Sequence, residues 1–210
     1  DLKHCKYRNV FLIQMYMGLR CGEALALTTH DIDLHHRKMN IHRTLTTDEN
    51  NAVIMGNKTK TYAGKRIVPI PDFLYPYIIE QMQIANEQIN NEEKLLFKPL
   101  NRKYTSRTNV NSELQRILER NFNIIGISTH SLRHTYGTRC IESGMAPVVV
   151  QKLMGHKDIG VTLNTYTTVF DKFKEAEIDK VNQYYLNENL IANNNTSCIS
   201  DRNLPNEYER

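Results

Sequence analysis

The chain is organised around two neighbouring segments, THSLRHTYGTRC at residues 129–140 and LMGHKDIGVTLNTYT at residues 153–167. On a helix, His130 and Arg133 occupy positions i and i+3, so their side chains share one face. In the second segment a Gly-His pair precedes Tyr166 in a threonine-rich setting. Several side chains that can bind an anion therefore lie within a short length of sequence.

The beginning of the first segment favours an anion. Ser128 or Thr129 is a suitable N-terminal cap, so a helix is expected to begin beside His130. A helix N-terminus carries free backbone N–H groups and a partial positive charge, which suit a phosphate. His134, on the next turn, is interpreted as a packing residue or as a support for a neighbouring site residue, rather than as a contact of the phosphate itself.

A third segment, GLRCGEALAL at residues 18–27, places Arg20 where one helical pattern ends and another begins. A glycine on each side lets the backbone turn tightly, so that Arg20 can reach inward instead of into solvent. The alternative is a surface arginine at a helix junction. Glu23 is a candidate to hold either Arg20 or a neighbouring helix.

These three segments resemble the motifs of the tyrosine recombinases, the phage- and transposon-type integrases, over roughly residues 7–190. GLRCGEALAL is similar to the family's first-arginine box, HSLRHTYGT to its second box, and LMGHKDIGVTLNTY to its third box with the nucleophilic tyrosine. The resemblance implies the tyrosine recombinase catalytic-domain fold, mainly α with a small antiparallel β-sheet (α+β). It also implies site-specific cutting and rejoining of DNA through a 3′-phosphotyrosyl intermediate, for integration or excision of a mobile element.

The catalytic residues implied by this resemblance are Arg20, Lys60, His130, Arg133, His156 and Tyr166. Tyr166 is then the nucleophile, the two arginines bind the phosphate, and His130 accepts the phenol proton. His156 donates a hydrogen bond to the phosphate, and Lys60 protonates the leaving 5′ oxygen. TKTYAGKRIVPIP at residues 59–71 is similar to the family's lysine segment; Lys60 is favoured there, and Lys58 remains an alternative because hairpin loops vary in length.

The proposed chemistry explains these residue types. A phosphodiester gains negative charge on its non-bridging oxygens in the transition state, and guanidinium groups offer a rigid, permanently charged fork of donors. A phenol titrates near pH 10, so nearby cations and a base are needed to ionise it. The sequence has neither a carboxylate cluster for magnesium nor a GxxxxGK[ST] loop, so no metal and no cofactor are expected.

Composition sets broader limits. The 210 residues are 40% hydrophobic and 24% charged, which is typical of an ordinary globular domain. A net charge of +4 permits nucleic acid binding without showing it. The four cysteines form no CxxC pair, which favours reduced thiols and a cytoplasmic location, associated with the nucleoid in a bacterial host. No apolar run is long enough for a membrane span.

The remaining patterns predict the supporting elements. Residues 38–70 indicate an antiparallel hairpin or a small three-stranded sheet, and residues 72–89 and 106–124 indicate helices. The charge run that includes Lys65 and Arg66, taken alone, is typical of a solvated loop. The histidines of this part lack the spacing of metal ligands and are interpreted as solvated; they are His30, His35, His36 and His42.

We expect residues 1–190 to form a catalytic domain and the Asn-rich residues 191–210 to form a flexible tail. We also expect the separate N-terminal DNA-binding domains of the family to be absent from this chain. Double-stranded DNA is the expected partner, with a synaptic tetramer in the full-length protein and no membrane association. Four aromatic or apolar residues share one face of the last helix and pack either in their own subunit or against a neighbour: Phe170, Phe173, Val181 and Tyr184.

Two other functions are compatible with the same residues. A type IB topoisomerase nicks and closes one duplex with a related site, and a non-cleaving relative binds DNA without cutting it. The HxxR pattern and LMGH before Tyr166 favour the recombinase over the topoisomerase. The presence of every expected catalytic residue type favours an enzyme over a binding protein.

Overall fold

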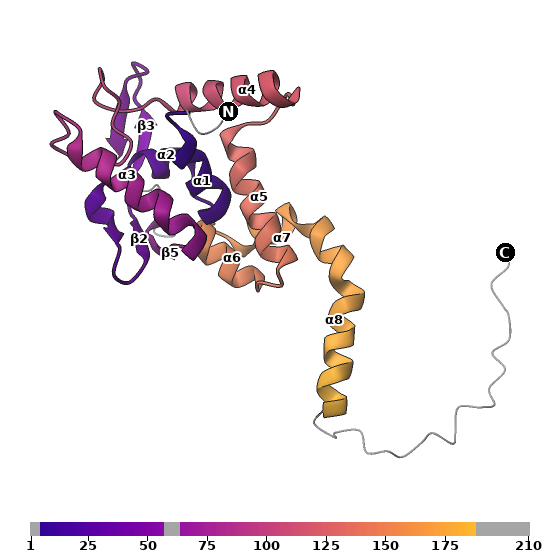
Figure 1. The fold of residues 1–210 in the computed structure, drawn as a ribbon. Helices are drawn as coiled ribbons and strands as arrows, with labels where there is room; N and C mark the ends of the chain where they lie inside the picture. Colours follow the sequence, from indigo (N-terminus) through magenta and orange to yellow (C-terminus); the bar gives the residue numbers. More distant parts are fainter. Residues whose placement is uncertain (1–4, 57–63, 188–210) are drawn as a thin grey trace, which may run out of the picture. The chain divides into compact units, whose positions relative to one another are not determined.

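The structure is a computed structural model that describes residues 5–56 and 64–187, except for the side chains of residue 168 and residues 170–177 (Figure 1). It divides into two units, Asp1–Val169 and Phe170–Arg210. The helices and strands of the first unit, in chain order, are α1 (Arg8–Met17), α2 (Cys21–Leu25), η2 (Thr29–Asp31), β1 (Ile32–Asp33), β2 (Lys38–Ile41), β3 (Thr44–Thr47), β4 (Val53–Gly56), β5 (Arg66–Pro69), η4 (Asp72–Leu74), α3 (Tyr75–Glu87), α4 (Arg107–Phe122), α5 (Thr129–Glu142), α6 (Pro147–Met154) and α7 (Ile159–Thr165).

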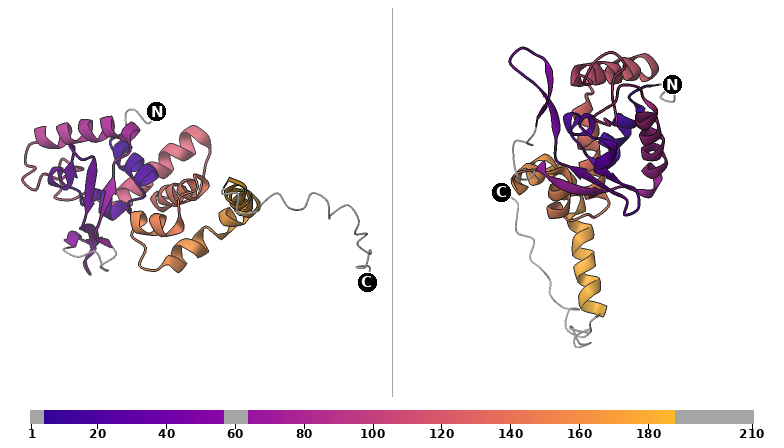
Figure 2. Two further views of the ribbon diagram at one scale, coloured as in Figure 1. Left: turned by 90° about the horizontal axis from the view of Figure 1, so that it is seen from below. Right: turned by 90° about the vertical axis from the view of Figure 1, so that its left-hand side faces the viewer.

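The core of the first unit forms around α1. Its apolar side chains recur at helical spacing, and Val10, Ile13 and Met17 are all buried. Gly18 ends the helix with φ +68, and a Cβ atom at this position would overlap the ring of Tyr136 on α5. This close approach sets α1 beside α5, as both ribbon figures show (Figures 1 and 2).

The strands are antiparallel, as expected, but they form two sheets instead of one. β2 lies between β1 and β5, with Met39 opposite Val68, whereas β3 pairs with β4 alone among the described strands. His42 and Arg43, between β2 and β3, both contact the buried carboxylate of Asp31, at 2.7 and 2.6 Å. These contacts hold the link between the sheets to η2. β3 packs against α2, and the turn between β3 and β4 projects from the body of the first unit (Figure 2, right).

The contact to Asp31 also corrects one expectation. His42 was predicted to be solvated, but its side chain is only 35% exposed and it shares a hydrogen bond with Asp31. A buried carboxylate needs hydrogen-bonding partners, and His42 supplies one of them. The other three histidines of this part, His30, His35 and His36, are exposed as expected.

Local capping determines where the later helices begin. Ser128 caps α5 through a capping box with Ser131, and Ser106 caps α4 by accepting a hydrogen bond from the Thr108 backbone N–H. The segment predicted as one helix over residues 72–89 is a 3₁₀ turn, η4, followed by α3. α6 ends at Gly155 in the left-handed conformation, with φ +65.

Helix α8 (Thr167–Asn187) begins in the first unit and forms the described part of the second. The side chains of Val181 and Tyr184 are 47% and 59% exposed, whereas those of Phe170 and Phe173 lie outside the described set. Residues 191–210 are also outside it, so the predicted tail stays a prediction. Among the described helices, none is long and apolar enough to cross a membrane.

Candidate active site

The C-terminal end of α6 brings the predicted arginines together. The side chain of Arg133, on α5, donates from NH2 to the carbonyl oxygen of Met154 at 2.6 Å. Arg20, at the N-terminal cap of α2, donates from NH2 to the carbonyl oxygen of Gly155 at 3.1 Å. The last carbonyl groups of a helix lack partners within it and carry partial negative charge, so they attract cations.

Arg133 is the most deeply placed of these cations. Its side chain is almost fully buried, and NH1 donates to the carbonyl oxygen of Gly18 at 2.5 Å. Burial, and then the neighbouring charge of Arg20, lower the pKa of Arg133 to about 9. This pKa is still above neutrality, so Arg133 remains a cation at pH 7.

Arg20 is more open and is held by Glu23. Its side chain is 43% exposed, while that of Glu23 is 2% exposed. The carboxylate accepts hydrogen bonds from Arg20 NH1 at 2.8 Å and from the Arg20 backbone N–H at 2.9 Å. The prediction that Arg20 reaches inward was wrong, because the residue is exposed at the junction of α1 and α2, as in the alternative of a surface arginine. Gly22 instead allows β3 to approach, since a Cβ atom there would overlap the Leu45 carbonyl oxygen. Arg20 therefore combines a fixed base with an accessible guanidinium.

Tyr166 also contacts Met154, through its sulfur atom instead of its carbonyl group. It follows α7, is 2% exposed, and its hydroxyl donates to the Met154 Sδ atom at 3.6 Å. Burial raises the pKa of its phenol, while the Arg133 charge acts in the opposite direction. In this conformation the phenol is covered, so it must leave its present contacts before it can meet a phosphate.

The two histidines of the predicted site are neutral at pH 7. Burial lowers the pKa of His156 to about 4, with further lowering by Arg133, Arg20 and the buried Arg66. His156 Nδ1 lies 2.8 Å from the Thr162 hydroxyl oxygen. When that hydroxyl donates to Nδ1, the imidazole proton is on Nε2, which is then free to donate.

His130 stands near the start of α5, edge-to-face with His134 at 4.4 Å between ring centroids. Partial burial is the main cause that lowers the pKa of His130, and His134, Arg133 and Arg20 act in the same direction. A neutral imidazole at this position is able to accept a proton. His134, predicted either to pack or to support a neighbouring site residue, is exposed and contacts His130 through its ring.

Comparison with known proteins shows the family of this chain. Residues 1–172 match the sequence profile described as the Phage integrase family. The chain belongs to this family. A tyrosine recombinase XerC-like protein of Caldanaerobacter subterraneus subsp. tengcongensis is 28% identical over 200 residues, 88% of this chain and 51% of the relative. The transposase from transposon Tn916 of Enterococcus faecalis is 31% identical over 204 residues, 91% of this chain and 49% of the relative. The chain thus spans about half the length of these curated relatives.

Solved structures of integrases and recombinases share the fold. The Tn1549 transposon integrase, solved in complex with transposon right end DNA, superposes with a TM-score of 0.66 at 24% identity, over 77% of this chain and 54% of that one. XerA recombinase superposes with a TM-score of 0.64 at 17% identity, over 84% and 58%. The predicted family and its mainly α fold with small antiparallel sheets are thereby confirmed.

Sequence reasoning missed one buried charge at the site of this integrase-family chain. Lys65 is exposed, but the Arg66 side chain is only 6% exposed, so the alternative of a solvated loop does not hold for Arg66. The sequence carried no signal for this burial, because RIVPI at residues 66–70 lacks an alternation of polar and apolar residues, and the apolar Ile67 is 62% exposed. Lys60 and its alternative Lys58 lie outside the described residues.

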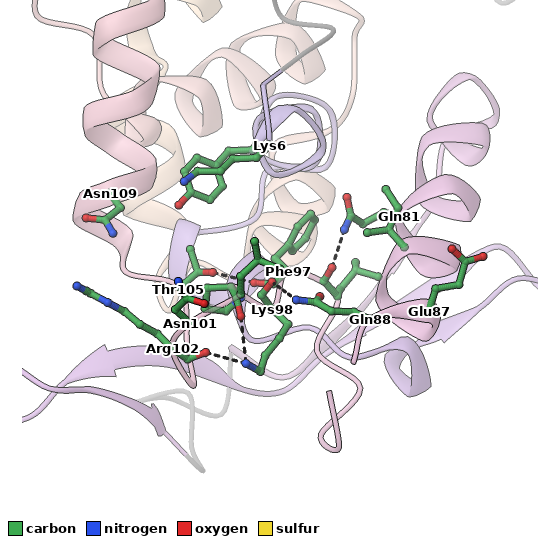
Figure 3. Close-up of a pocket in the computed structure, with 15 residues that line it drawn as sticks. Lys6, Gln81, Glu87, Gln88, Phe97, Lys98, Asn101, Arg102, Thr105 and Asn109 are labelled. Carbon is green, nitrogen blue, oxygen red and sulfur yellow. Dashed lines mark hydrogen bonds between the residues drawn. The ribbon is translucent and has the colours of Figure 1, made fainter. Parts of the chain in front are cut away.

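The predicted catalytic residues of the described part of the chain lie apart from its large cavity. This cavity, of about 840 Å³, lies between the C-terminal half of α3 and the segment 96–105, and none of these catalytic residues borders it (Figure 3). Among the described residues, no cluster of His, Cys, Asp and Glu could hold a metal ion. The candidate site therefore combines one exposed arginine, Arg20, with a buried arginine, Arg133, and a covered tyrosine, Tyr166.

Proposed function

We propose that this chain is the catalytic part of a tyrosine-type site-specific recombinase, an integrase that inserts or excises a mobile element. The observation that carries the proposal is the meeting of Arg20, Arg133 and Tyr166 at the end of α6. Met154 lies at the centre of this arrangement, because its carbonyl accepts from Arg133 and its sulfur accepts from Tyr166. An anion-binding pair next to a phenol suits phosphoryl transfer to tyrosine.

The reaction needs neither metal nor ATP. The Tyr166 phenol oxygen attacks the phosphorus of a DNA phosphodiester, the P–O bond to the 5′ oxygen breaks, and a 3′-phosphotyrosyl link forms. The 5′ hydroxyl of another strand then attacks this link and releases the tyrosine. The energy of the broken diester is kept in the phosphotyrosyl bond, so the second step rejoins DNA without an external energy source.

The side chains divide the work. Arg20 and Arg133 neutralise the charge that develops on the non-bridging oxygens, for which they must exchange backbone carbonyls for phosphate. Neutral His130 accepts the phenol proton, and His156 donates a hydrogen bond to the phosphate. Lys60 protonates the leaving 5′ oxygen; the resemblance supports this role, and Lys58 is the alternative donor.

Double-stranded DNA is the partner. The Tn1549 integrase, which shares the fold, was solved with its transposon end DNA. We further propose that the full-length protein assembles as a synaptic tetramer on DNA, in the cytoplasm of a bacterial host and on its nucleoid. Apolar and aromatic side chains exposed on α8 support contacts between copies; they are Ile178, Val181, Tyr184, Tyr185 and Leu186.

Covalent trapping tests the proposal. The chain is mixed with a pool of duplexes of randomised sequence, each carrying a nick from which a short fragment can diffuse after cleavage. Adducts that survive denaturation are isolated and their DNA is sequenced. The wild type should form an adduct at Tyr166, whereas Tyr166→Phe should form none and keep its DNA affinity within a few fold. An adduct in the Tyr166→Phe variant would show that the nucleophile is another residue.

The two alternatives give different products. Two duplexes that carry a recovered sequence, one of them labelled, should exchange strands if the chain is part of a recombinase. Relaxation of a supercoiled plasmid without any exchange would instead indicate a topoisomerase. Binding with no adduct on any sequence would indicate a non-cleaving relative.

A further inference from the structure

A third arginine shares the end of α6 with the proposed catalytic pair. Arg66, at the start of β5, donates from Nε to the carbonyl oxygen of Leu153 at 2.6 Å. Three consecutive carbonyls, those of Leu153, Met154 and Gly155, therefore accept from three arginines. Arg66 also donates from NH1 to the carbonyl oxygen of Gly64 at 3.2 Å. Its donors are thus engaged within the protein, and its side chain is only 6% exposed.

Glu23 connects this buried arginine to the exposed one. Arg66 donates from NH2 and NH1 to the two carboxylate oxygens of Glu23, at 2.9 and 3.2 Å. The same two oxygens accept from the side chain and the backbone of Arg20. Burial on its own raises the pKa of Glu23, but hydrogen bonds from Arg66 and the charges of both arginines bring that pKa below its ordinary value. Glu23 is therefore an anion that both guanidinium groups share.

The geometry of this link determines where Arg20 lies. Two oxygens held by a planar fork cannot rotate freely, so Arg66 fixes the plane of the Glu23 carboxylate. That carboxylate in turn fixes both ends of Arg20, its backbone N–H and its guanidinium. Through Leu153, Arg66 also fixes the last turn of α6, whose next carbonyls hold Arg133 and Arg20. A lysine would keep the charge but would lose the fork.

We propose that Arg66 is a positioning residue for strand cleavage. It acts through Glu23 and the end of α6 to present the Arg20 guanidinium to the phosphate, and it does not touch DNA itself. The inference rests on the proposed function and adds to it a residue of the matched lysine segment to which the resemblance assigned no role. A misplacement of about 1 Å in a catalytic group costs about a hundredfold in rate.

A purely structural role makes a different prediction. If Arg66 only stabilised the fold, its loss would slow cleavage of every substrate to the same extent. If it acts through Arg20, its loss should matter less on a DNA whose phosphate cannot be gripped by a fork. A methylphosphonate at the scissile position provides this DNA, because a methyl group replaces one non-bridging oxygen.

The experiment measures single-turnover cleavage by the full chain at saturating DNA, on nicked duplexes of a sequence recovered by covalent trapping. Wild type, Arg66→Lys, Arg20→Lys and the double variant are compared on phosphodiester and methylphosphonate DNA. The matched control is Arg139→Lys, because Arg139 is 75% exposed and pairs only with Glu142 among its described contacts, at 2.7 Å. Melting temperature and DNA affinity are recorded for each variant.

We expect Arg66→Lys to cleave the phosphodiester about a hundredfold more slowly, with affinity unchanged within a few fold. The double variant should be no slower than Arg20→Lys, because Arg66 acts through the Arg20 fork and that fork is already lost. On methylphosphonate DNA the difference between Arg66→Lys and wild type should shrink, as it should for Arg20→Lys. Arg139→Lys should match the wild type on both substrates.

Three outcomes would overturn the inference. Losses that multiply in the double variant, or equal slowing on both substrates, would show that Arg66 does not act through Arg20. If Arg66→Lys fails to fold, Glu23→Gln decides in its place, since it breaks the same link with a side chain of the same shape. If the wild type cleaves and Glu23→Gln cleaves equally fast, Glu23 does not connect Arg66 to Arg20 and the inference is wrong. Absence of any wild-type adduct would instead refute the proposed function itself.

Discussion

Gly137 on α5 leaves the space that the phenol of Tyr166 occupies. A Cβ atom at Gly137 would overlap the hydroxyl oxygen and the adjoining ring carbon of Tyr166. The phenol of the proposed nucleophile thus packs against the α5 backbone at Gly137, and the Met154 sulfur accepts its hydrogen bond. Any side chain at position 137 would prevent this packing.

Gly137→Ala should therefore expose Tyr166 in the absence of DNA. Insertion of a methyl group into a filled site costs about 1–3 kcal/mol, so the melting temperature should also fall. Nitration of tyrosines, mapped by mass spectrometry, should show faster modification of Tyr166 than in the wild type. Gly160→Ala in α7 is the control, because a Cβ atom there makes only an ordinary contact, 3.4 Å from Asp158 Oδ1. Unchanged nitration of Tyr166 in Gly137→Ala would contradict the packing of the phenol against Gly137.

The pKa of His156 predicts how stability depends on pH. Its folded-state pKa is about 4, compared with about 6.5 in an unfolded chain. Between these values the unfolded state binds a proton that the folded state does not, so the free energy of unfolding should fall as pH decreases through this window. Above about pH 6.5 this contribution should be constant.

Denaturant unfolding at pH 7 and pH 5 tests this sign. His156→Gln should lose less stability between the two pH values than the wild type does, because the titrating group is gone. His30→Gln, at an exposed position on η2, should behave like the wild type. An NMR titration in which His156 protonates near pH 6.5 would contradict the expected depression of its pKa.

Local chemistry made much of the fold readable from the sequence. Ser128 begins α5 because capping depends on a few neighbouring residues, and the apolar spacing around Val10 identifies α1 without reference to anything distant. The extra sheet was not predictable in the same way. Its separation depends on the contact of Arg43 with Asp31, and nothing in a strand pattern encodes that pairing.

The site, like the fold, could be predicted from the sequence only in part. Motif resemblance selected Arg20 and Arg133, and the structure brings both to the end of α6. The motif resemblance gave no indication that Arg66 joins them, because the partners of Arg66 are Glu23 and Leu153, which are far away in the sequence. The covered position of Tyr166 was also unexpected, since the amino-acid sequence defines a nucleophile without defining the conformation in which it waits.

DNA binding by this chain should be weak and strongly dependent on salt. The net charge is only +4, and the proposed contacts are guanidinium groups on phosphate, which release counterions when they form. Affinity measured with the Tyr166→Phe variant avoids covalent capture. It should fall steeply between about 50 and 200 mM salt, with a linear relation between the logarithms. A flat response would argue against binding dominated by the DNA backbone.

The separate roles of Arg20 and Lys60 lead to the last prediction. Arg20→Lys keeps the charge but loses the planar fork, so cleavage should fall by roughly a hundredfold, as when one transition-state donor is removed. Lys60→Ala should slow cleavage for another reason, because the 5′ oxygen would then leave without a proton. DNA with a bridging 5′ sulfur does not need that proton, since a thiolate is a far better leaving group than an alkoxide.

A two-by-two comparison of cleavage rates on normal and 5′-thio DNA separates the two roles. The sulfur should restore cleavage by Lys60→Ala and should not restore cleavage by Arg20→Lys, whose defect lies on the non-bridging oxygens. Restoration of Lys58→Ala in place of Lys60→Ala would move the general acid two residues toward the N-terminus. Equal restoration of the arginine and lysine variants would mean that both side chains act on the leaving group, because only a shared target would respond to the same atom.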